Sequence, residues 1–574
     1  MREGVLIGLL IIGIIYLRYQ EYVLYVWQNP FMMFSFGVGS VFLCGVYYLL
    51  RHGLEKLINR INMYRAGIKI TSKDKKVSFP FISFDIAHVL SKFVKDEPKN
   101  ALTFIGLNAE KKNREVVSLS DSQRTQHLQV LGMTGTGKST SIFYPLIYQD
   151  AKKNRPIIII DAKGEMSAIN TINSILESVG RSEDFLLFSL SHKRYSCSYN
   201  PLYVGDYDPQ IVIDSFFSNY DDQNTFFREM SKTIFTHAFF ILYSLGKLFS
   251  TMDVYCYLNN EYCRQTINKQ INIENKLGYL HLKLFNQVIS DLKDQYRGWR
   301  HVIAGFNNFL TSFDDSLLND DDSDIVLSDV IRNRKIVYFQ LPTNAYPLQA
   351  ISIARMVQSN LRYISSMLQT GQLKNEGMVS VLIDEYGSFA EKTFVEVLNK
   401  ARSSKMMVTI AHQSLGDLQN ISPTFMKLID ENTLNKIYLK QTDPELAELV
   451  SKNMGTYTKE EKTYRMTAGL WGNQMHSGES SNKTVQEFYF SPDKVKSLHK
   501  YGQGYFIYRG DNTQKCVNFG QFENIQNKPY EKKIKKVKMS GWQLFEKYYL
   551  EDEREKIQSV RVENAEKGLI GSDE

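Results

Sequence analysis

A glycine-rich loop between His127 and Ser141, HLQVLGMTGTGKSTS, carries residues whose types and spacing suit phosphate binding. It fits the pattern G-x-x-x-x-G-K-[ST], in which glycines let backbone N–H groups approach phosphates without Cβ clashes. Lys138 is expected to reach the β- and γ-phosphates, and the Ser139 hydroxyl to complete a Mg²⁺ shell. The helix that follows directs the positive end of its dipole at the same anion. The loop therefore predicts a site for ATP and Mg²⁺, whose contacts are Gly132, Thr134, Gly135, Thr136, Gly137, Lys138, Ser139 and Thr140.

An apolar run that ends in two acidic residues supplies the second half of such a site. The stretch is MVSVLIDEYGSFA, in which Asp384 and Glu385 follow the apolar residues directly. We expect Asp384 to hold Mg²⁺ through water and Glu385 to polarise the attacking water. The same pattern also fits a buried strand that ends in a solvated turn, so its combination with Lys138 is what favours catalysis.

Gln413 lies just past the end of a third apolar run, KMMVTIAHQS. A polar side chain at that position can sense the γ-phosphate. An ordinary hydrogen bond at the end of a strand is the simpler alternative.

These side chains must be positioned by a sheet whose strands end at a common edge. Apolar runs alternate with helical patterns along the chain, which is typical of a parallel sheet covered on both faces. The loop and Asp384 then meet at the carboxyl ends of the strands. The predicted fold class is α/β with a P-loop nucleotide domain, and its strands are HLQVLG, RPIIIIDAKGE, DFLLFSL, KIVYFQLP, SVLIDE, MVTIAH, NKIYLK and GYFIYRG.

One region interrupts the alternation, from about Asp206 to Asp324. Long helical patterns replace the strands there, as in FFREMSKTIFTHAFFILYSLGK and KLGYLHLKLFNQVISDLKDQYRGW. We interpret the region as an all-α domain inserted into the nucleotide domain. Its aromatic and basic residues could bind single-stranded DNA, but a core of aromatics under solvated charges is the simpler interpretation. The acidic run NDDDSD at its end is expected to be a solvated loop, since the spacing of a calcium loop is absent.

The first fifty residues predict a membrane anchor. Phe31 to Leu50 carries no charge across 20 residues, and as a helix such a stretch is about 30 Å long, the thickness of the hydrocarbon core. Val5 to Leu17 is equally apolar, and it reaches the length of a membrane span by continuing to Trp27. A cleaved signal peptide is the alternative for this stretch, although no cleavage site follows it. Basic residues come next, so the two spans place both termini and the body in the cytoplasm. These residues are Arg51, Lys56, Arg60, Arg65 and Lys69.

Composition argues against other classes of protein. The net charge of +7 comes from 69 basic and 62 acidic residues, and this excess is too small to indicate a nucleic-acid-binding protein by itself. The five cysteines are odd in number and form no CxxC pair, which indicates reduced thiols and neither a disulfide framework nor a zinc site. They are Cys44, Cys197, Cys256, Cys263 and Cys516.

The tail from about Pro529 is rich in lysine and then predicts a helix, GWQLFEKYYLEDEREKI, which either docks a partner or caps the domain. The predicted organisation is a transmembrane hairpin (1–52), a membrane-proximal segment (53–120), the nucleotide domain in two parts (121–205 and 326–525), the all-α domain (206–325) and a charged tail (526–574).

In this order the motifs resemble the conjugative coupling proteins of the TraD/TrwB kind, the coupling ATPases of type IV secretion. The resemblance rests on two N-terminal spans, GMTGTGKS, DAKGE, a helical insertion, LIDEYGSFA, ARSSKMMVTIAHQSLGDL and GQGYFIYRG, and it covers nearly the whole chain. DAKGE departs from the family's proline-containing DPKGE, although Asp161, Lys163 and Glu165 still match.

The resemblance implies more than the residues do. Such proteins are RecA-like motors that form hexameric rings at the bacterial inner membrane and pass a relaxase bound to single-stranded DNA to the type IV secretion channel. Asp384 and Glu385 then match the Walker B pair and Gln413 the sensor. Arg402, in ARSSK, matches the arginine that points into the neighbouring subunit's site, and Arg124 is expected to touch the nucleotide.

Three alternatives remain open at this point. A FtsK- or HerA-like DNA translocase would share the motor, as would a coupling ATPase that exports protein effectors without DNA. A membrane scaffold with a degenerate nucleotide site is disfavoured by the intact Lys138, Asp384, Glu385 and Gln413.

Overall fold

The structure is a computed structural model, and all of its described residues belong to one compact unit, Lys69–Glu574. The described residues are 71–72, 82–96, 102–110, 115–293, 298–375, 377–400, 402–468, 474–498, 501–511, 513–522, 529–531, 543–544 and 547–548. Both predicted membrane spans lie outside these residues. Within them, no helix combines the length and the apolar character that crossing a membrane requires.

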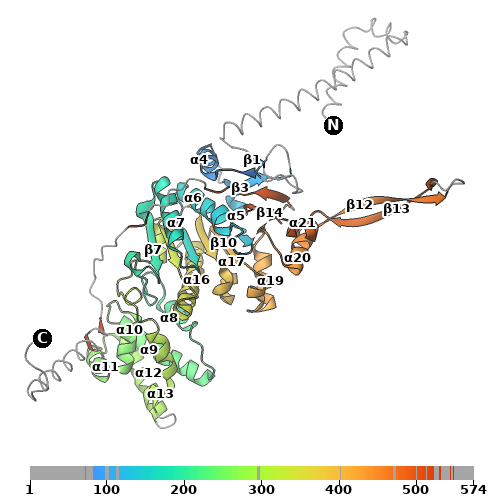
Figure 1. Ribbon diagram of the computed structural model, residues 1–574. Helices are drawn as coiled ribbons and strands as arrows, with labels where there is room; N and C mark the ends of the chain where they lie inside the picture. Colours follow the sequence, from blue (N-terminus) through green and yellow to red (C-terminus); the bar gives the residue numbers. More distant parts are fainter. Residues whose placement is uncertain are drawn as a thin grey trace, which may run out of the picture. The chain divides into compact units, whose positions relative to one another are not determined.

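The centre of the fold is an eleven-stranded sheet with the order β4-β3-β15-β14-β11-β5-β10-β9-β6-β8-β7 (Figure 1). The strands from β11 to β7 run parallel, and their apolar, β-branched sequences suit strands that are buried on both faces. The predicted large parallel sheet is confirmed. These strands are β5 (Leu128–Leu131), β6 (Ile157–Asp161), β7 (Phe185–Ser189), β8 (Ile336–Gln340), β9 (Val379–Asp384), β10 (Met406–His412) and β11 (Asn435–Tyr438).

The other end of the sheet is antiparallel. GYFIYRG was expected to add a parallel strand, and that expectation is wrong, because β14 (Gln503–Tyr508) pairs antiparallel with β11. A buried strand has the same apolar pattern in either direction, so periodicity carries no information on its polarity. The sheet continues through β15 (Thr513–Asn518), β3 (Leu102–Asn108) and β4 (Val116–Ser120), so part of the predicted membrane-proximal segment belongs to the same sheet.

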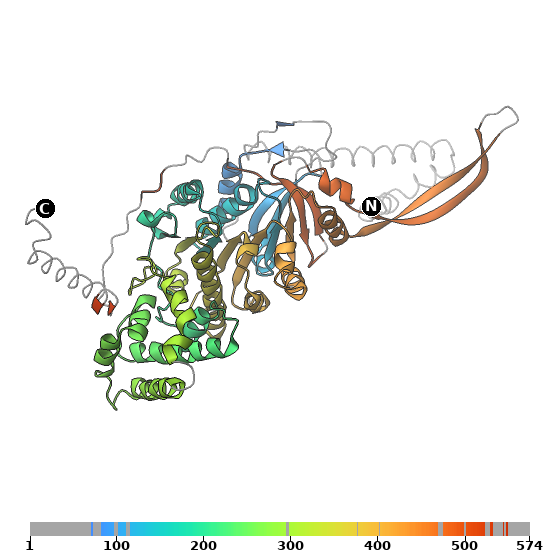
Figure 2. The ribbon, with the colours of Figure 1, turned by 60° about the horizontal axis from the view of Figure 1, so that its bottom comes forward.

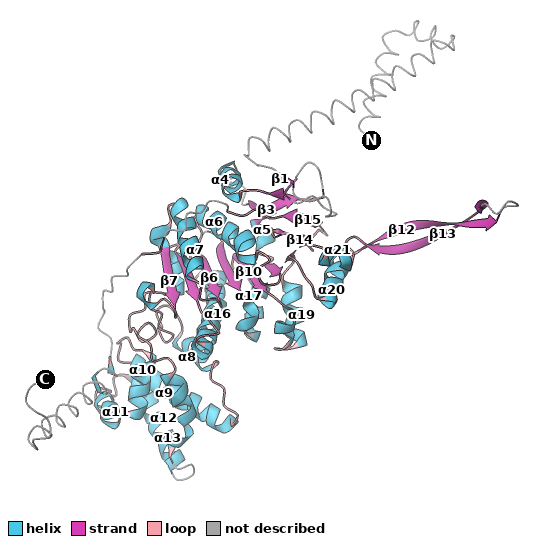
Figure 3. Cartoon of the chain, in the orientation of Figure 1, coloured by secondary structure: helices cyan, strands magenta, loops and turns pink. Residues whose placement is uncertain are grey.

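Helices cover both faces of the sheet (Figure 3). Alternate residues of one strand divide between the faces: Ile158 and Ile160 join a core cluster with α16 (Pro347–Thr370), whereas Ile157 and Ile159 face away from it. The α16 side also holds α15 (Leu327–Arg332), α17 (Val395–Lys400), α18 (Gly416–Gln419) and α19 (Pro423–Asn432). The opposite side holds α4 (Ile86–Asp96), α6 (Tyr144–Lys152) and α7 (Met166–Ser178).

The described residues between β7 and β8 contain helices and no strand, and Figure 2 shows these helices in green on one side of the sheet. Their aromatic side chains form a core, in which the Phe216 ring packs against Phe235, Phe309 and Phe313 at centroid distances of 5.3, 5.4 and 5.3 Å. Besides α15, the α-helices between these strands are α8 (Pro209–Phe217), α9 (Thr225–Tyr243), α10 (Thr251–Asn259), α11 (Glu261–Asn268), α12 (Lys276–Lys293), α13 (Trp299–Val302) and α14 (Ala304–Thr311).

The acidic run at the end of this helical region is not fully solvated, contrary to expectation. Asp321 is buried beside Asp253 of α10, and burial together with that neighbouring carboxyl group raises the pKa of Asp321. Asp253 also accepts a hydrogen bond from the backbone N–H of Leu544 at 2.5 Å. Leu544 is itself buried, and the Tyr548 ring contacts Tyr262. The described tail residues 543–544 and 547–548 therefore pack on the helical region, whereas Tyr530 packs against Phe185 of β7.

A long two-stranded ribbon, β12 (Thr456–Ala468) and β13 (Gln474–Phe488), leaves the body between α20 (Pro444–Met454) and α21 (Pro492–Lys496) (Figure 1). The remaining short elements are β1 (Thr71–Ser72), β2 (Ile82–Ser83) and α5 (Asp121–Arg124).

Candidate nucleotide site

The glycine-rich loop joins β5 to a π-helical turn (Lys138–Phe143) that continues into α6. Gly137 has φ +97°, a left-handed conformation that residues with a Cβ rarely adopt. A Cβ on Gly132 would lie 2.7 Å from Thr136 Oγ1, so the close packing of the loop also requires glycine there. Both positions that the phosphate-binding pattern fixes as glycine thus require glycine, Gly137 for its backbone conformation and Gly132 for lack of space for a Cβ.

Lys138 and Ser139 both turn toward the carboxyl edge of the sheet. Lys138 Nζ donates to the carbonyl oxygen of Gly132 at 2.7 Å and lies 3.8 Å from Glu385 Oε1. Burial lowers the pKa of Lys138, against the opposing effect of Glu385 and Asp384. Ser139 Oγ donates to Asp384 Oδ2 at 2.9 Å. The structure therefore brings together the hydroxyl and the carboxylate that were predicted to share Mg²⁺.

Glu385 sits in a left-handed backbone conformation, φ +53°, immediately after β9. Such a conformation costs a residue with a Cβ about 1–2 kcal/mol, so surrounding contacts must hold it. Gln413 is one of them, because its Nε2 donates to Glu385 Oε2 at 2.9 Å. Gln413 Oε1 in turn accepts from Thr134 Oγ1 at 2.8 Å. Gln413 thus links the phosphate loop to Glu385, an arrangement that suits a sensor better than a plain strand-end hydrogen bond.

Three residues of DAKGE lie in the same site, Asp161, Lys163 and Glu165, although the sequence assigned them no role there. Asp161 is the last residue of β6 and is paired in register with Asp384. Burial and the charge of Asp384 raise the pKa of Asp161 to about 7, while Tyr338 donates its hydroxyl to Asp161 Oδ2 at 2.8 Å. Lys163 Nζ lies 3.1 Å from Glu385 Oε1 and 3.5 Å from Asp384 Oδ2. The position of Asp161 at a strand end was the sequence signal that could have identified it.

Tyr501 is a further member of the site that sequence reasoning missed. Its hydroxyl contacts Thr140 Oγ1, and its ring lies within 3.2 Å of where a Cβ on Gly137 would stand. Tyr501 lies two residues before the start of β14, far along the chain from the loop that it touches. No local pattern marks such a residue.

The phosphate loop, Asp161, Lys163, Asp384 and Tyr501 line a cavity of about 360 Å³ between the phosphate loop, the end of β6 and the start of α7. The volume falls within the range of small-molecule sites, roughly 300–1,000 Å³. Both lysines, Ser139 and Asp384 line it. Hydroxyl and carboxylate oxygens are the ligands that Mg²⁺ prefers, so the donor set fits a magnesium–nucleotide complex.

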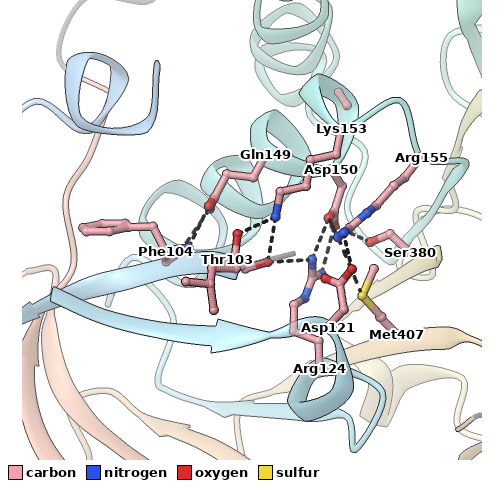
Figure 4. A network of polar contacts seen from close by, with 12 residues as sticks. Thr103, Phe104, Asp121, Arg124, Gln149, Asp150, Lys153, Arg155, Ser380 and Met407 are labelled. Atoms are coloured by element: carbon pink, nitrogen blue, oxygen red, sulfur yellow. Dashed lines mark hydrogen bonds and ion pairs between the residues drawn. The ribbon is translucent and has the colours of Figure 1, made fainter. Parts of the chain in front are cut away.

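Arg124 is not in this site, which corrects the expectation that it touches the nucleotide. It ends α5 before β5, whereas the phosphate loop follows β5, so the two lie at opposite ends of that strand. Figure 4 shows the buried guanidinium on Asp150, to which its two terminal nitrogens donate at 2.6 and 2.9 Å. Burial alone would raise the pKa of Asp150, but Arg124 and Arg155 together hold it below its usual value. Arg124 thus stabilises the packing of α5 and α6.

Arg402 is exposed and lies in a turn before β10. The helix that precedes it, α17, ends at Lys400. The carboxyl end of β10, where Gln413 follows, is at the opposite edge of the sheet, and Arg402 is absent from the lining of its own chain's cavity. Any contact of Arg402 with a nucleotide would therefore be with that of another subunit.

Two protein-family models match parts of the chain. The model described as the TraM recognition site of TraD and TraG matches residues 378–500. The model described as the central domain of the helicase HerA matches residues 103–234. Together they cover both halves of the nucleotide site, the phosphate loop in the second match and the acidic strand end in the first.

Among curated proteins, the type 4 coupling protein DotL of Legionella pneumophila is 22% identical over 398 residues, 60% of this chain and 50% of DotL. The chain thus spans about half the length of this relative. Among solved structures, the unbound conjugative coupling protein TrwBΔN70 is 14% identical with a TM-score of 0.48, covering 72% of this chain and 88% of that one. VirB4 of Thermoanaerobacter pseudethanolicus is also 14% identical, with a TM-score of 0.41 over 73% of this chain and 96% of that one.

Proposed function

We propose that the chain is an ATP-hydrolysing motor of the type IV coupling protein family, the TraD/TrwB kind, and that it couples a substrate to a type IV secretion channel. The observation that carries the proposal is the pair of contacts Ser139–Asp384 and Gln413–Glu385. They join the phosphate loop to the carboxylates at the strand ends, as hydrolysis of a bound triphosphate requires.

Each side chain has a role in the proposed reaction. The backbone N–H groups of the loop and Lys138 bind the phosphates, and Ser139 and Asp384 are the residues that would hold Mg²⁺. The ion supplies charge neutralisation on the phosphates when it is bound. Glu385 accepts a hydrogen bond from the attacking water and orients it, and Gln413 holds the second carboxylate oxygen of Glu385 in place.

The proposed substrate is a relaxase bound to single-stranded DNA, delivered to the channel components at the bacterial inner membrane. The two apolar stretches before residue 52 would anchor the chain with both termini in the cytoplasm. The subunits would form a ring, most simply a hexamer, in which Arg402 reaches the neighbouring nucleotide. The description of the model that matches residues 378–500, a recognition site of TraD and TraG, supports this choice of family.

A second candidate function is a HerA-like DNA translocase outside secretion, which the match of residues 103–234 favours. A coupling ATPase for protein effectors alone is a third, since DotL is named as a coupling protein without reference to DNA. All three share the motor, and they differ in what stimulates it.

The test measures ATP hydrolysis by the purified full-length chain alone, with single-stranded DNA, and with DNA-bound relaxase encoded nearby. Stimulation by both DNA samples, together with co-purification of channel components, supports coupling of conjugation. Stimulation by DNA without any channel partner supports the translocase. Absence of hydrolysis under all conditions would reject the motor itself.

A further inference from the structure

The nucleotide site contains a second lysine, Lys163, on the loop that follows β6. Its ammonium group lies between the two carboxylates, 3.1 Å from Glu385 Oε1 and 3.5 Å from Asp384 Oδ2. The side chain is 33% exposed and lines the cavity, so it faces the space that a nucleotide would enter. Lys163 therefore lies in the site with part of its side chain exposed to the cavity.

The two lysines of the site are held differently. Lys138 is 4% exposed and donates to a carbonyl oxygen of its own loop, at a longer distance of 3.8 Å from Glu385. Lys163 is the closer cation to Glu385, and Asp384 and Glu385 raise the pKa of Lys163 even though burial alone would lower it. Lys163 thus carries its charge throughout the physiological pH range, and it neutralises the carboxylates when no nucleotide is present.

Lys163 lies on the same oxygen of Asp384 that Ser139 contacts, and Ser139 and Asp384 are the residues that would hold Mg²⁺. Asp384 Oδ2 accepts from Ser139 Oγ and also faces Lys163 Nζ. A divalent cation beside Ser139 and Asp384 would repel the ammonium group from that oxygen. The γ-phosphate, which enters the cavity with the same complex, offers a new anionic partner to a flexible side chain.

We infer that Lys163 is a second phosphate-binding lysine, which holds Asp384 and Glu385 in the nucleotide-free protein and transfers to the γ-phosphate when the magnesium complex enters. The transfer releases Glu385 Oε1 to face the attacking water while Gln413 keeps Oε2 in place. It also adds a positive charge where negative charge develops in the reaction. The inference deepens the proposed ATP hydrolysis and rests on it.

The alternative is a fixed clamp, in which Lys163 neutralises the carboxylates in every state and never touches the nucleotide. The two arrangements differ in what they predict for nucleotides with and without a γ-phosphate. A clamp treats ATP and ADP alike, whereas a γ-phosphate ligand discriminates between them.

The experiment compares Lys163→Gln and Lys163→Arg in the full-length protein. Lys232→Gln is the matched control, because Lys232 is 38% exposed and pairs with Asp214 at 2.9 Å on the helical region, away from the nucleotide site. Binding of ADP and of a non-hydrolysable ATP analogue is measured with Mg²⁺, and binding of Mn²⁺ is measured without nucleotide by electron paramagnetic resonance. Thermal unfolding confirms that each variant is folded.

We expect Lys163→Gln to weaken binding of the ATP analogue by about tenfold or more and binding of ADP by less than about threefold, as for a charged phosphate contact. Mn²⁺ should bind the nucleotide-free variant more tightly than the wild type, because the competing ammonium group is gone. Lys163→Arg should keep most of the discrimination, and Lys232→Gln all of it.

An equal loss of affinity for both nucleotides, or no loss for either, would overturn the inference in favour of the fixed clamp. Unchanged Mn²⁺ binding would contradict the competition at Asp384. Because these readouts need no turnover, a wild type that binds nucleotide but fails to hydrolyse it would reject the proposed function separately.

Discussion

At the scale of single residues, the site is built around Glu385. Its backbone is held in a left-handed conformation, and its two carboxylate oxygens have different partners: Gln413 on one and the lysines on the other. Binding of phosphate and activation of water therefore fall on separate side chains. Substitutions should separate the two functions.

Lys138→Ala and Glu385→Gln should both abolish ATP turnover, for different reasons. Loss of Lys138 removes a positive charge from the phosphates and weakens nucleotide binding, whereas Glu385→Gln keeps the shape of the side chain and removes the carboxylate that activates water. Nucleotide binding measured beside hydrolysis checks this. Hydrolysis at the wild-type rate by Glu385→Gln would show that Glu385 is not the activating residue.

Arg402→Ala should bind ATP and hydrolyse it poorly. An arginine supplied by a neighbouring subunit is worth on the order of 10³ to 10⁵ in rate, whereas an exposed salt bridge contributes under about 1 kcal/mol. Mixing Arg402→Ala with Lys138→Ala should restore some activity, since an intact Lys138 can then meet an intact Arg402 across one interface. Mixed rings that stay inactive at every ratio would show that another residue, not Arg402, acts on the neighbouring nucleotide.

At the scale of elements, the parallel strands explain why residues so far apart in sequence share a site. β10 lies between β5 and β9, and all three strands are parallel. The phosphate loop, Asp384 and Gln413 therefore all lie at the carboxyl ends of these strands, on one edge of the sheet. The helical region is held together by its aromatic core, and the described part of the tail adds Leu544 beside Asp253. The carboxyl pair Asp253–Asp321 at that contact should make this region sensitive to pH.

The free energy of unfolding should decrease as the pH rises from about 4 toward 8, because Asp321 of this carboxyl pair loses its proton in that range. Burial, with Asp253 next to it, raises the pKa of Asp321 from 3.8 to about 8. The folded state therefore binds more protons than the unfolded state within that window, and its stability decreases as the pH increases. Thermal unfolding at pH 6 and pH 8.5 checks the sign.

Asp321→Asn mimics the protonated form and should reduce the difference in Tm between the two pH values. Asp314→Asn, at an exposed aspartate of the same region, is the matched control. A pH dependence identical in wild type and Asp321→Asn would refute the role of this carboxyl pair.

At the scale of the whole molecule, the candidate nucleotide site, the helical region and the ribbon β12–β13 are parts of one compact unit. The mild net charge of +7 means that any binding of DNA must come from a local arrangement of basic and aromatic side chains. The proposed cargo makes a specific demand on that arrangement.

Binding of DNA should tolerate any sequence and weaken steeply with salt, because the expected contacts are phosphates and stacked bases. Single strands should bind at least as well as duplex. Titrations of both at two salt concentrations measure this. An affinity that does not respond to salt would favour the protein-effector alternative.

The sequence by itself determined the nucleotide site, because the phosphate loop and the strand ends are local patterns and parallel strands bring their carboxyl ends to one edge. The loop glycines, Lys138, Ser139, Asp384, Glu385 and Gln413 could all be identified in this way. Features that depend on packing between distant segments were decided only by the tertiary structure. It placed Arg124 on Asp150 at the far end of β5, Lys163 between the carboxylates and Tyr501 on the loop. The tertiary structure also decided that β14 is antiparallel, because an apolar pattern is the same for either strand direction. It buried Asp321 as well, because the sequence of an acidic run does not show which distant segment will pack over it.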